Sequence, residues 1–433
     1  MTTELRRSLR LPDGLAMIVG LMIGSGIFRT PGVIAAELGR PWLTFVAWSL
    51  GGVIALAGAL IFAELGTRHP RAGGKYVYVR EAFGPRAGFA VGVVEIGCYA
   101  AAGAAITVVA GEYASQLAGW PASAIPIAGV TALVLFTAIN LVGVAAGRLV
   151  QNVVTAAKVT AFVGVVALAF AGGGGAGWGA ALPAAPSGGA AFIALAVAFQ
   201  AVIWTYYGYP DAGKVAEEVV DPQRTLPRIF IGSIAVTAAL YLLLNAAFVH
   251  VLPFETLASS RLPAHDVAVA LLGARGGVVI EALALLVVLA SINGNLFVTP
   301  RVVFAIARDG LAPAALARVN RGGSPWAAVL LVGVAVLGLA LSGTFEQLLG
   351  IAVTLLLLTD GATALALVRL RRREPAAAFS VPLYPLVVVG FVAVYAALLV
   401  TAAVAAPVPA LVSGGVLVAA ALISAVWVPA RRA

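Results

Sequence analysis

The apolar segment over residues 15–36 is interrupted by three consecutive small residues, Gly24, Ser25 and Gly26. In hydrocarbon each unpaired backbone amide or carbonyl costs several kcal/mol, so a helix break survives only where it lines a cavity or binds a ligand. A half-helix that starts after the break points free amides and the positive end of its dipole at an anion such as a carboxylate. The predicted substrate-binding residues at this break are Ile23, Gly24, Ser25, Gly26 and Ile27. The amides of residues 25–27 would bind a carboxylate, and the carbonyl of Ile23 would meet an ammonium group. The alternative is close helix packing through Gly20 and Gly24, because small residues four apart let helices approach in membranes.

A second apolar segment, residues 190–219, is interrupted by Gly208 and Pro210. Proline removes one helical hydrogen bond and disfavours helical geometry in the residue before it. The carbonyls freed at this break can bind a cation such as an ammonium group, and the indole of Trp204 can close over it. The predicted cation site consists of Trp204, Thr205, Tyr206, Tyr207 and Gly208. The alternative is a kinked helix with an aromatic belt, although these aromatic residues lie in the middle of the segment.

The two predicted sites together favour a small zwitterion that carries a carboxylate and an ammonium group on the same carbon. A matched pair of interrupted apolar segments is the best pointer in a sequence to the binding site of a transporter. The three histidines and the single cysteine, Cys98, show no metal-ligand spacing. The sequence therefore predicts no metal and no cofactor.

The composition places both segments in a membrane. Hydrophobic residues make up 62% of the 433 residues, charged residues make up 10%, and the mean hydropathy is +1.04. So few charges cannot cover the surface of a soluble protein of this length. Twelve apolar segments are long enough to span hydrocarbon about 30 Å thick, and they lie near residues 14–37, 42–66, 87–117, 123–144, 149–170, 190–217, 228–252, 276–307, 325–342, 346–368, 384–406 and 409–429.

The net charge of +9 reflects membrane topology and not nucleic-acid binding. Most of the 27 Lys and Arg residues fall on the side of the twelve predicted spans that holds both termini, an asymmetry known as the positive-inside rule. The exceptions are Arg29, Arg40, Arg261, Arg275 and, within a span, Lys158. We therefore expect a multi-pass protein of the cell membrane with both termini in the cytoplasm and no nucleic-acid partner.

The expected fold class is an all-α polytopic membrane protein. Because the breaks fall in the first and sixth spans, the first ten spans divide into five plus five. An odd number of spans in each half makes the two halves inverted relative to one another. The expected parts are residues 1–170 with helices 1–5, residues 171–370 with helices 6–10, and residues 371–433 with two peripheral helices.

Three stretches resemble the amino acid–polyamine–organocation (APC) superfamily, and more narrowly its amino acid permeases, which include L-type exchangers and bacterial proton-coupled homologues. They are residues 24–28 (G-S-G-I-F), 217–228 (E-E, then L-P-R) and 300–310 (P-R, then A-R-D-G). The resemblance implies a LeuT-like inverted repeat and secondary transport of amino acids by alternating access. Residues 204–209 depart from the family pattern in a bulkier gate and a final tyrosine, which leaves side-chain selectivity open.

Lys158 lies inside the fifth predicted span, where a charge costs at least about 2.5–3.5 kcal/mol and is a functional-site hypothesis by default. A snorkelling or paired structural lysine is the alternative. In the resembling permeases a lysine on helix 5 takes the place of a sodium ion. This implies contacts from Lys158 to residues 20–24 and to Ser291, and no sodium dependence. Glu95, in the third span, is expected to relay protons, to pair with a cationic substrate, or to make a structural hydrogen bond.

The leading hypothesis is secondary active transport of amino acids, neutral L-amino acids foremost, by proton symport or by amino acid exchange. A polyamine or another organic cation is the alternative substrate, and a membrane-embedded transferase enzyme is the remote alternative. The acidic residues Glu217, Glu218 and Asp221 are expected to pair with arginines such as Arg71 or Arg224 at a cytoplasmic gate.

Overall fold

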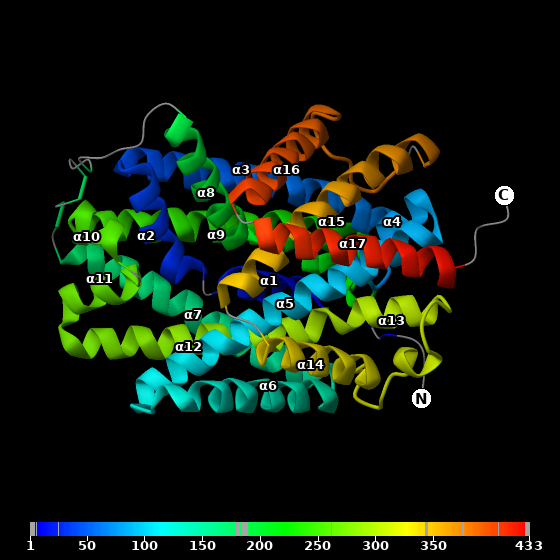
Figure 1. The fold of residues 1–433 in the computed structure, drawn as a ribbon, viewed down its shortest axis with the longest axis horizontal. Coiled ribbons are helices and arrows are strands. Elements are labelled where there is room, and N and C mark those ends of the chain that lie inside the picture. Colours follow the sequence, from blue (N-terminus) through cyan, green and yellow to red (C-terminus); the bar gives the residue numbers. More distant parts are fainter. Residues whose placement is uncertain are drawn as a thin grey trace.

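The computed structural model describes residues 5, 7–24, 26–172, 174–175, 177–178, 182, 189–260, 262–342, 345–374, 376–405 and 407–428. Over these residues the chain forms helices joined by turns, with an isolated bridge between Leu9 and Val219. Most of the long helices run roughly along the long axis of a single bundle (Figure 1). The described residues therefore have the predicted all-α, polytopic architecture.

The long helices are α1 (Leu11–Met22), α2 (Gly26–Leu38), α3 (Pro41–Arg68), α5 (Pro85–Ala118), α6 (Ile125–Val142), α7 (Val144–Ala171), α8 (Gly189–Tyr206), α9 (Pro222–Val251), α12 (Ala274–Val298), α14 (Trp326–Ala340), α15 (Phe345–Arg373), α16 (Leu386–Ala405) and α17 (Pro407–Trp427). The short α-helices are α4 (Lys75–Phe83), α10 (Phe254–Ser259), α11 (Pro263–Leu272) and α13 (Pro300–Arg308). The 3-10 helices are η1 (Ala122–Ala124), η2 (Tyr209–Gly213), η3 (Ala216–Glu218) and η4 (Ala314–Ala317). The sequence analysis missed α4, α10 and α11, which lie between predicted spans.

The number of helices that can cross a membrane is close to the prediction. Nine described helices are long and apolar enough, and α1 with α2, bent by 46° at their break, makes a tenth. α8 and α14 lie where the other two spans were predicted, and α14 has only 15 residues. All twelve predicted segments thus contain helix, while twelve membrane crossings stay a prediction.

Both predicted helix breaks are present. α1 ends at Met22, and α2 begins at Gly26, the last residue of the predicted interruption. α8 ends shortly before Gly208, whose φ of 129° is a conformation that glycine adopts without strain. The prediction that the sixth span continues to residue 217 was wrong, because the chain forms η2 and η3 there. Pro210, at the start of η2, has no amide to donate to a helical hydrogen bond.

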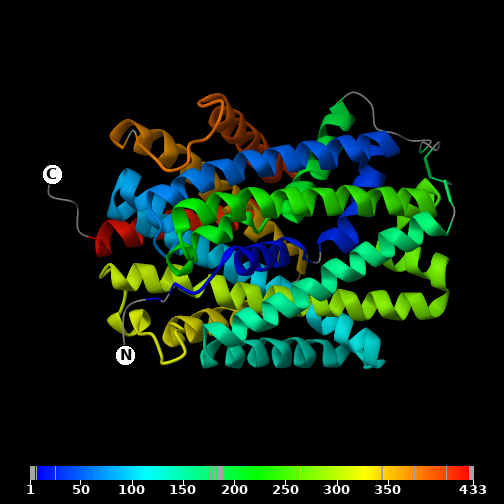
Figure 2. The same cartoon turned by 180° about the vertical axis from the view of Figure 1, so that it is seen from behind.

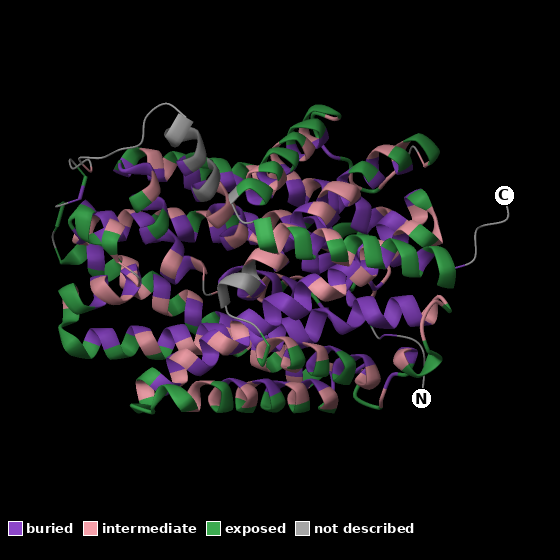
Figure 3. Cartoon of the chain, in the orientation of Figure 1, coloured by how far each residue is buried: buried purple, intermediate pink, exposed green. Residues whose placement is uncertain are grey.

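α5 lies at the centre of the bundle, where buried residues predominate, whereas exposed residues gather on the outer helices (Figure 3). In its most apolar stretch, 72% of α5 is buried, compared with 17% for α17. Leu411 and Val426 on α17 are 76% and 89% exposed. Extended apolar surface of this kind marks a membrane-contacting face. The outside of the bundle therefore suits lipid, and α5 is positioned to line an internal site.

Ion pairs join separate elements at one end of the bundle, which we call the termini end because the chain enters α1 and leaves α17 there (Figures 1 and 2). Arg308 on α13 donates to both carboxylate oxygens of Glu217, at N–O distances of 2.6 and 2.8 Å. Arg301 at the start of α13 is buried and lies 2.9 Å from Glu218. The same segment is tied to the N-terminal residues, since the amide of Leu9 donates to the carbonyl of Glu218.

The partners predicted for the two glutamates were wrong. Both are bound by arginines of α13, because the fold carries that helix back to the segment after the second break. Arg71 instead lies 3.3 Å from Asp309. The predicted pair of Asp221 with Arg224 is present at 4.0 Å on an exposed surface, where an ion pair contributes little.

The Glu217 pair gives a pH-dependent stability. Burial alone raises the pKa of Glu217, but hydrogen bonds from Arg308 and from the Ala72 amide outweigh it and hold the pKa below its ordinary value. Its ionised form therefore stabilises the fold above the ordinary carboxylate pKa of about 4.3, and this contribution is lost as the pH falls through the lowered value. We expect wild type to exceed Glu217→Gln in thermal unfolding midpoint near neutral pH, with the difference shrinking below about pH 4.3.

The measurement is thermal unfolding of detergent-purified protein over a pH series. Glu255→Gln is the matched control, because Glu255 is exposed, and it should follow wild type throughout. A gap between wild type and Glu217→Gln that stays constant into the acid range would contradict the assignment.

Candidate functional site

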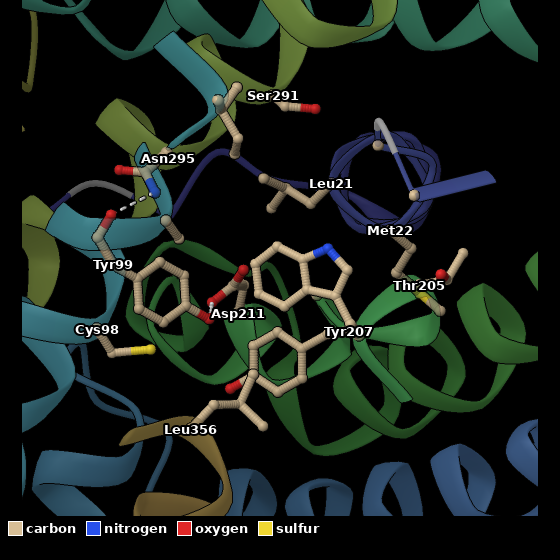
Figure 4. A pocket seen from close by; sticks show the side chains of 16 residues that line it. Leu21, Met22, Cys98, Tyr99, Thr205, Tyr207, Asp211, Ser291, Asn295 and Leu356 are labelled. Carbon is tan, nitrogen blue, oxygen red and sulfur yellow. Dashed lines mark hydrogen bonds between the residues drawn. The ribbon is translucent and has the colours of Figure 1, made fainter. Parts of the chain in front are cut away.

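A cavity of about 90 Å³ lies where the two helix breaks meet (Figure 4). One water molecule needs roughly 10–15 Å³ of such space, so the cavity has room for a small solute. Its walls are mostly apolar and aromatic with a few polar groups, which is typical of small-molecule sites. The lining residues are Leu21, Met22, Gly24, Gly26, Cys98, Tyr99, Ala102, Ile106, Trp204, Thr205, Tyr207, Gly208, Asp211, Ser291, Asn295 and Leu356.

The cavity brings together predicted residues from both breaks, namely Gly24, Gly26, Trp204, Thr205, Tyr207 and Gly208. Ile23, Ile27 and Tyr206 are buried but do not line it. The hydroxyl of Tyr206 donates to the carbonyl of Trp48 on α3, so this side chain faces away from the cavity. Ser25 lies outside the described residues.

The two breaks touch each other, and glycine permits the contact. A Cβ atom on Gly208 would lie 3.0 Å from the amide nitrogen of Met22, and one on Gly26 would lie 2.9 Å from Oγ1 of Thr205. The hydroxyl of Tyr241 on α9 donates to the carbonyls of Met22 and Thr205, at 2.8 and 3.1 Å. The single proton of this hydroxyl is shared between a carbonyl from each break, which holds the two breaks together.

Lys158 on α7 binds the end of α1. Its side chain is fully buried, and Nζ donates to the carbonyl oxygens of Gly20 and Ile23 at 2.6 and 2.8 Å. These are the helix 1 contacts that the resemblance implied. The carbonyl of Ile23, predicted to meet the substrate, is therefore already engaged by an ammonium group of the protein.

Ser291 on α12 lies beside the first break but does not complete the contact implied by the resemblance. A Cβ atom on Gly24 would lie 3.7 Å from its hydroxyl oxygen, and Ser291 lines the cavity. Its hydroxyl donates to the carbonyl of Val287, 3.0 Å away in the same helix. Serine commonly makes this bond within a helix. Among the described residues, no hydrogen bond joins Ser291 to Lys158.

A buried group of acids and lysines begins at the cavity wall. Tyr99 on α5 donates to Oδ1 of Asp211 at 2.5 Å, and both residues line the cavity (Figure 4). Nζ of Lys214 lies 2.9 Å from the same Asp211 oxygen and 3.4 Å from Oε1 of Glu95. Glu95 itself is fully buried and lies behind Tyr99, one helical turn away on α5. Glu95 therefore does not line the cavity, and Lys214 and Asp211 connect it to the cavity wall.

A second buried pair adjoins the same wall. Nζ of Lys75 on α4 lies 2.5 Å from Oδ1 of Asp360 on α15. It also donates to the hydroxyls of Tyr207 and Thr359, at 2.7 and 3.0 Å. Tyr207 lines the cavity, so a single residue separates this pair from the cavity.

Sequence reasoning missed Lys75, Asp211 and Lys214 as site residues. It counted both lysines among the cytoplasmic surface charges, whereas each side chain is only 1% exposed. A signal was available in the composition. The chain has three lysines, at 75, 158 and 214, and arginine supplies every other basic residue. All three lysines are buried.

The chain is similar in sequence to a family of known proteins. Residues 9–426 match the family described as amino acid permease. The chain is 28% identical to the serine/threonine exchanger SteT of Bacillus subtilis (strain 168), over 88% of the chain and 87% of that protein. It is 30% identical to Asc-type amino acid transporter 1 of Mus musculus, over 93% and 78%. It is 32% identical to large neutral amino acids transporter small subunit 2 of Rattus norvegicus, over 73% and 61%.

The family match covers almost the whole chain and includes both helix breaks, the cavity between them and the buried charges beside it. The relatives named above are transporters or exchangers of amino acids. The chain belongs to the amino acid permease family of the APC superfamily.

Proposed function

We propose that this permease moves small neutral L-amino acids across the cell membrane by alternating access. The observation that carries the proposal is the single cavity bounded by both helix breaks. Half-helix ends and unwound backbone at such a site bind charged substrate groups in transporters built this way. The tight aromatic wall formed by Tyr99, Trp204 and Tyr207 favours a short side chain. The serine/threonine exchanger among the relatives supports the same substrate size.

The substrate carboxylate binds at the start of α2, whose first amides at residues 26–27 and positive dipole end face the break. The ammonium group binds on the α8 side, near the backbone of residues 204–207. The carbonyl of Ile23 contributes less than the sequence predicted, because Lys158 already donates to it. Trp204 forms the thin outer gate over the bound molecule.

The termini end is the cytoplasmic end in this proposal, since most Lys and Arg residues lie on that side of the predicted spans. The halves 1–170 and 171–370 act as inverted repeats, with 371–433 peripheral. The ion pairs of Glu217 and Glu218 then close the cytoplasmic side.

Two transport modes are compatible with the site, proton symport and exchange of one amino acid for another. A polyamine or other organic cation is a weaker candidate substrate. The acid that lines the cavity, Asp211, already pairs with Lys214 and Tyr99. The relatives are transporters and not enzymes, which makes a transferase less favoured still.

The experiment that tests the proposal is counterflow into proteoliposomes that hold the purified full-length chain. Labelled L-serine, L-alanine, L-leucine, L-lysine and the polyamine putrescine are each offered to vesicles preloaded with the unlabelled compound. We expect L-serine and L-alanine to enter fastest because of the small cavity. Empty liposomes are the control. Entry of putrescine alone, or of none of the five, would overturn the proposal.

A substitution at the second break tests the geometry of the site. Gly208→Ala places a side chain at φ 129°, 3.0 Å from the Met22 amide nitrogen. A left-handed backbone costs an L-residue roughly 1–2 kcal/mol, so the free protein relieves the strain by shifting the break. Binding must then restore the strained geometry, which corresponds to about tenfold weaker binding. We expect the KM for the best substrate to rise by about that factor. Gly414→Ala is the control, because no atom lies within 4 Å of a Cβ there. An unchanged KM in Gly208→Ala would contradict the contact between the breaks.

Lys158 supplies the positive charge that ties α7 to α1, and loosening of this tie is coupled to opening. Transport should therefore need no sodium and should continue when choline replaces it. Lys158→Ala loses two charged hydrogen bonds, each worth about 1.5–3 kcal/mol, so counterflow should fall roughly tenfold or more. Arg275→Ala, at an exposed basic residue, should match wild type. A sodium requirement in wild type would remove this role from Lys158.

A further inference from the structure

The buried acids and lysines beside the cavity do not balance. Glu95, Asp211 and Asp360 are three carboxylic acids, and Lys75 and Lys214 are two amines. None of the five is more than 2% exposed. With every group ionised, this five-residue cluster carries one net negative charge. Burial of an uncompensated charge is strongly unfavourable. The cluster therefore binds one further positive charge in its stable state.

The five residues act as one group although they come from separate elements. Lys214 bridges Asp211 to Glu95, and Lys75 holds Asp360. Lys75 is also within electrostatic range of Glu95, as Lys214 is of Asp360. The other titratable groups that face Glu95 are the hydroxyls of Tyr78 on α4 and Tyr99 on α5 and the thiol of Cys98. These three are neutral in their ordinary forms, so they leave the charge count unchanged.

Glu95 is the member with the fewest partners. Neither of its carboxylate oxygens has a hydrogen-bond partner of good geometry among the described residues. Its closest charge, Nζ of Lys214, lies at 3.4 Å, whereas the same ammonium lies 2.9 Å from Asp211. Asp211 also accepts from Tyr99, and Asp360 accepts from Lys75. A proton added to the cluster is therefore most stable on Glu95.

Lysine is the base that such a site requires. Arginine stays charged under all physiological conditions, whereas a buried lysine can exchange protons. The ion pairs at the termini end use Arg301 and Arg308, and both amines of the cluster are lysines. The chain thus has fixed charges at its closed end and titratable charges beside its cavity.

We propose that the five-residue cluster is the proton-binding site of this permease and takes up one proton, on Glu95, for each amino acid carried inward. This inference rests on the proposed amino acid transport and selects its symport mode. An O–H bond of a hydronium ion in the cavity breaks as its proton passes to Asp211. Lys214 then gives an N–H proton to Glu95 and takes the proton from Asp211, so that one O–H bond forms on Glu95. The same bond breaks when the proton passes to water at the termini end. In between, Lys214 is released from Glu95 and pairs with Asp211 alone.

The cluster is placed to connect protonation with opening of the termini end. The carbonyl of Lys214 accepts from the amide of Gly73. The amide of the preceding residue, Ala72, donates to the carboxylate of Glu217. Glu217 is in turn held by Arg308. A shift of Lys214 is therefore transmitted through one short stretch of backbone to the ion pairs that close the bundle.

The test uses proteoliposomes that contain the full-length chain and the trapped pH indicator pyranine. The substrate is whichever of L-serine, L-alanine, L-leucine and L-lysine gives the fastest counterflow. We expect its addition outside to acidify the lumen of wild-type vesicles. Glu95→Gln should lose this acidification while counterflow, which needs no net proton movement, stays measurable. Glu95→Asp should keep it, and the exposed control Glu255→Gln should match wild type.

The charge count gives a second test that a merely structural role for these residues does not predict. Asp360→Asn leaves two acids and two lysines, so its acidification should be lost as in Glu95→Gln. Adding Lys75→Met restores one excess negative charge, so the double variant Lys75→Met/Asp360→Asn should regain acidification. The double variant also covers the case in which Glu95→Gln does not fold.

Three results would overturn the inference. Counterflow without acidification in wild type leaves amino acid transport standing and removes the proton. Acidification that persists in folded Glu95→Gln places the proton elsewhere. Loss of L-lysine transport alone in Glu95→Gln, with acidification intact, assigns the excess negative charge to a cationic substrate side chain. Absence of counterflow in wild type is a different failure, that of the proposed function.

Discussion

A helix break inside hydrocarbon leaves amides and carbonyls without helical partners, and those groups must be satisfied from neighbouring helices or by a ligand. In this chain the requirement is met at the end of α1 by Lys158 and across both breaks by the hydroxyl of Tyr241. Glycines of both breaks border the cavity. The proposed site thus lies where two helices are interrupted.

The basic residues divide between two tasks that follow from their chemistry. Arginine binds carboxylates with two parallel hydrogen bonds and keeps its charge. It accordingly makes the ion pairs of Glu217 and Glu218. Lysine presents a single compact charge that can lose its proton. It is found only in the interior, on the breaks and among the acids next to the cavity.

One short stretch of chain, residues 208–217, links the cavity with the ion pairs at the termini end of the bundle. Gly208 and Asp211 line the cavity, Lys214 reaches Glu95, and Glu217 is held by α13. These positions follow one another on unwound backbone and 3-10 turns. In the proposed mechanism this segment transmits a change in charge at Lys214 and its partners to the cavity and to the ion pairs.

The sequence by itself determined the membrane class, the places of the helices and the two breaks. Each follows from a local property, namely hydropathy over about 20 residues or the backbone limits of glycine and proline. The contact of Lys158 with the first break was implied by family resemblance. Hydropathy could not indicate which side chains line the cavity, because that depends on how neighbouring helices pack. Ile27 and Tyr206 do not line it.

Only the tertiary structure decided which charges meet. Lys75 comes from a short helix that no apolar pattern marks, and Asp360 lies 285 positions further along the chain. Lys214 was counted as a surface charge at the inner end of the predicted sixth span, yet η2 folds it back into the interior. Opposite charges far apart in sequence are paired by the path of the backbone. The packing of the whole bundle sets that path. An unpaired buried charge is costly, but two opposite charges can pair only where the fold brings them within reach.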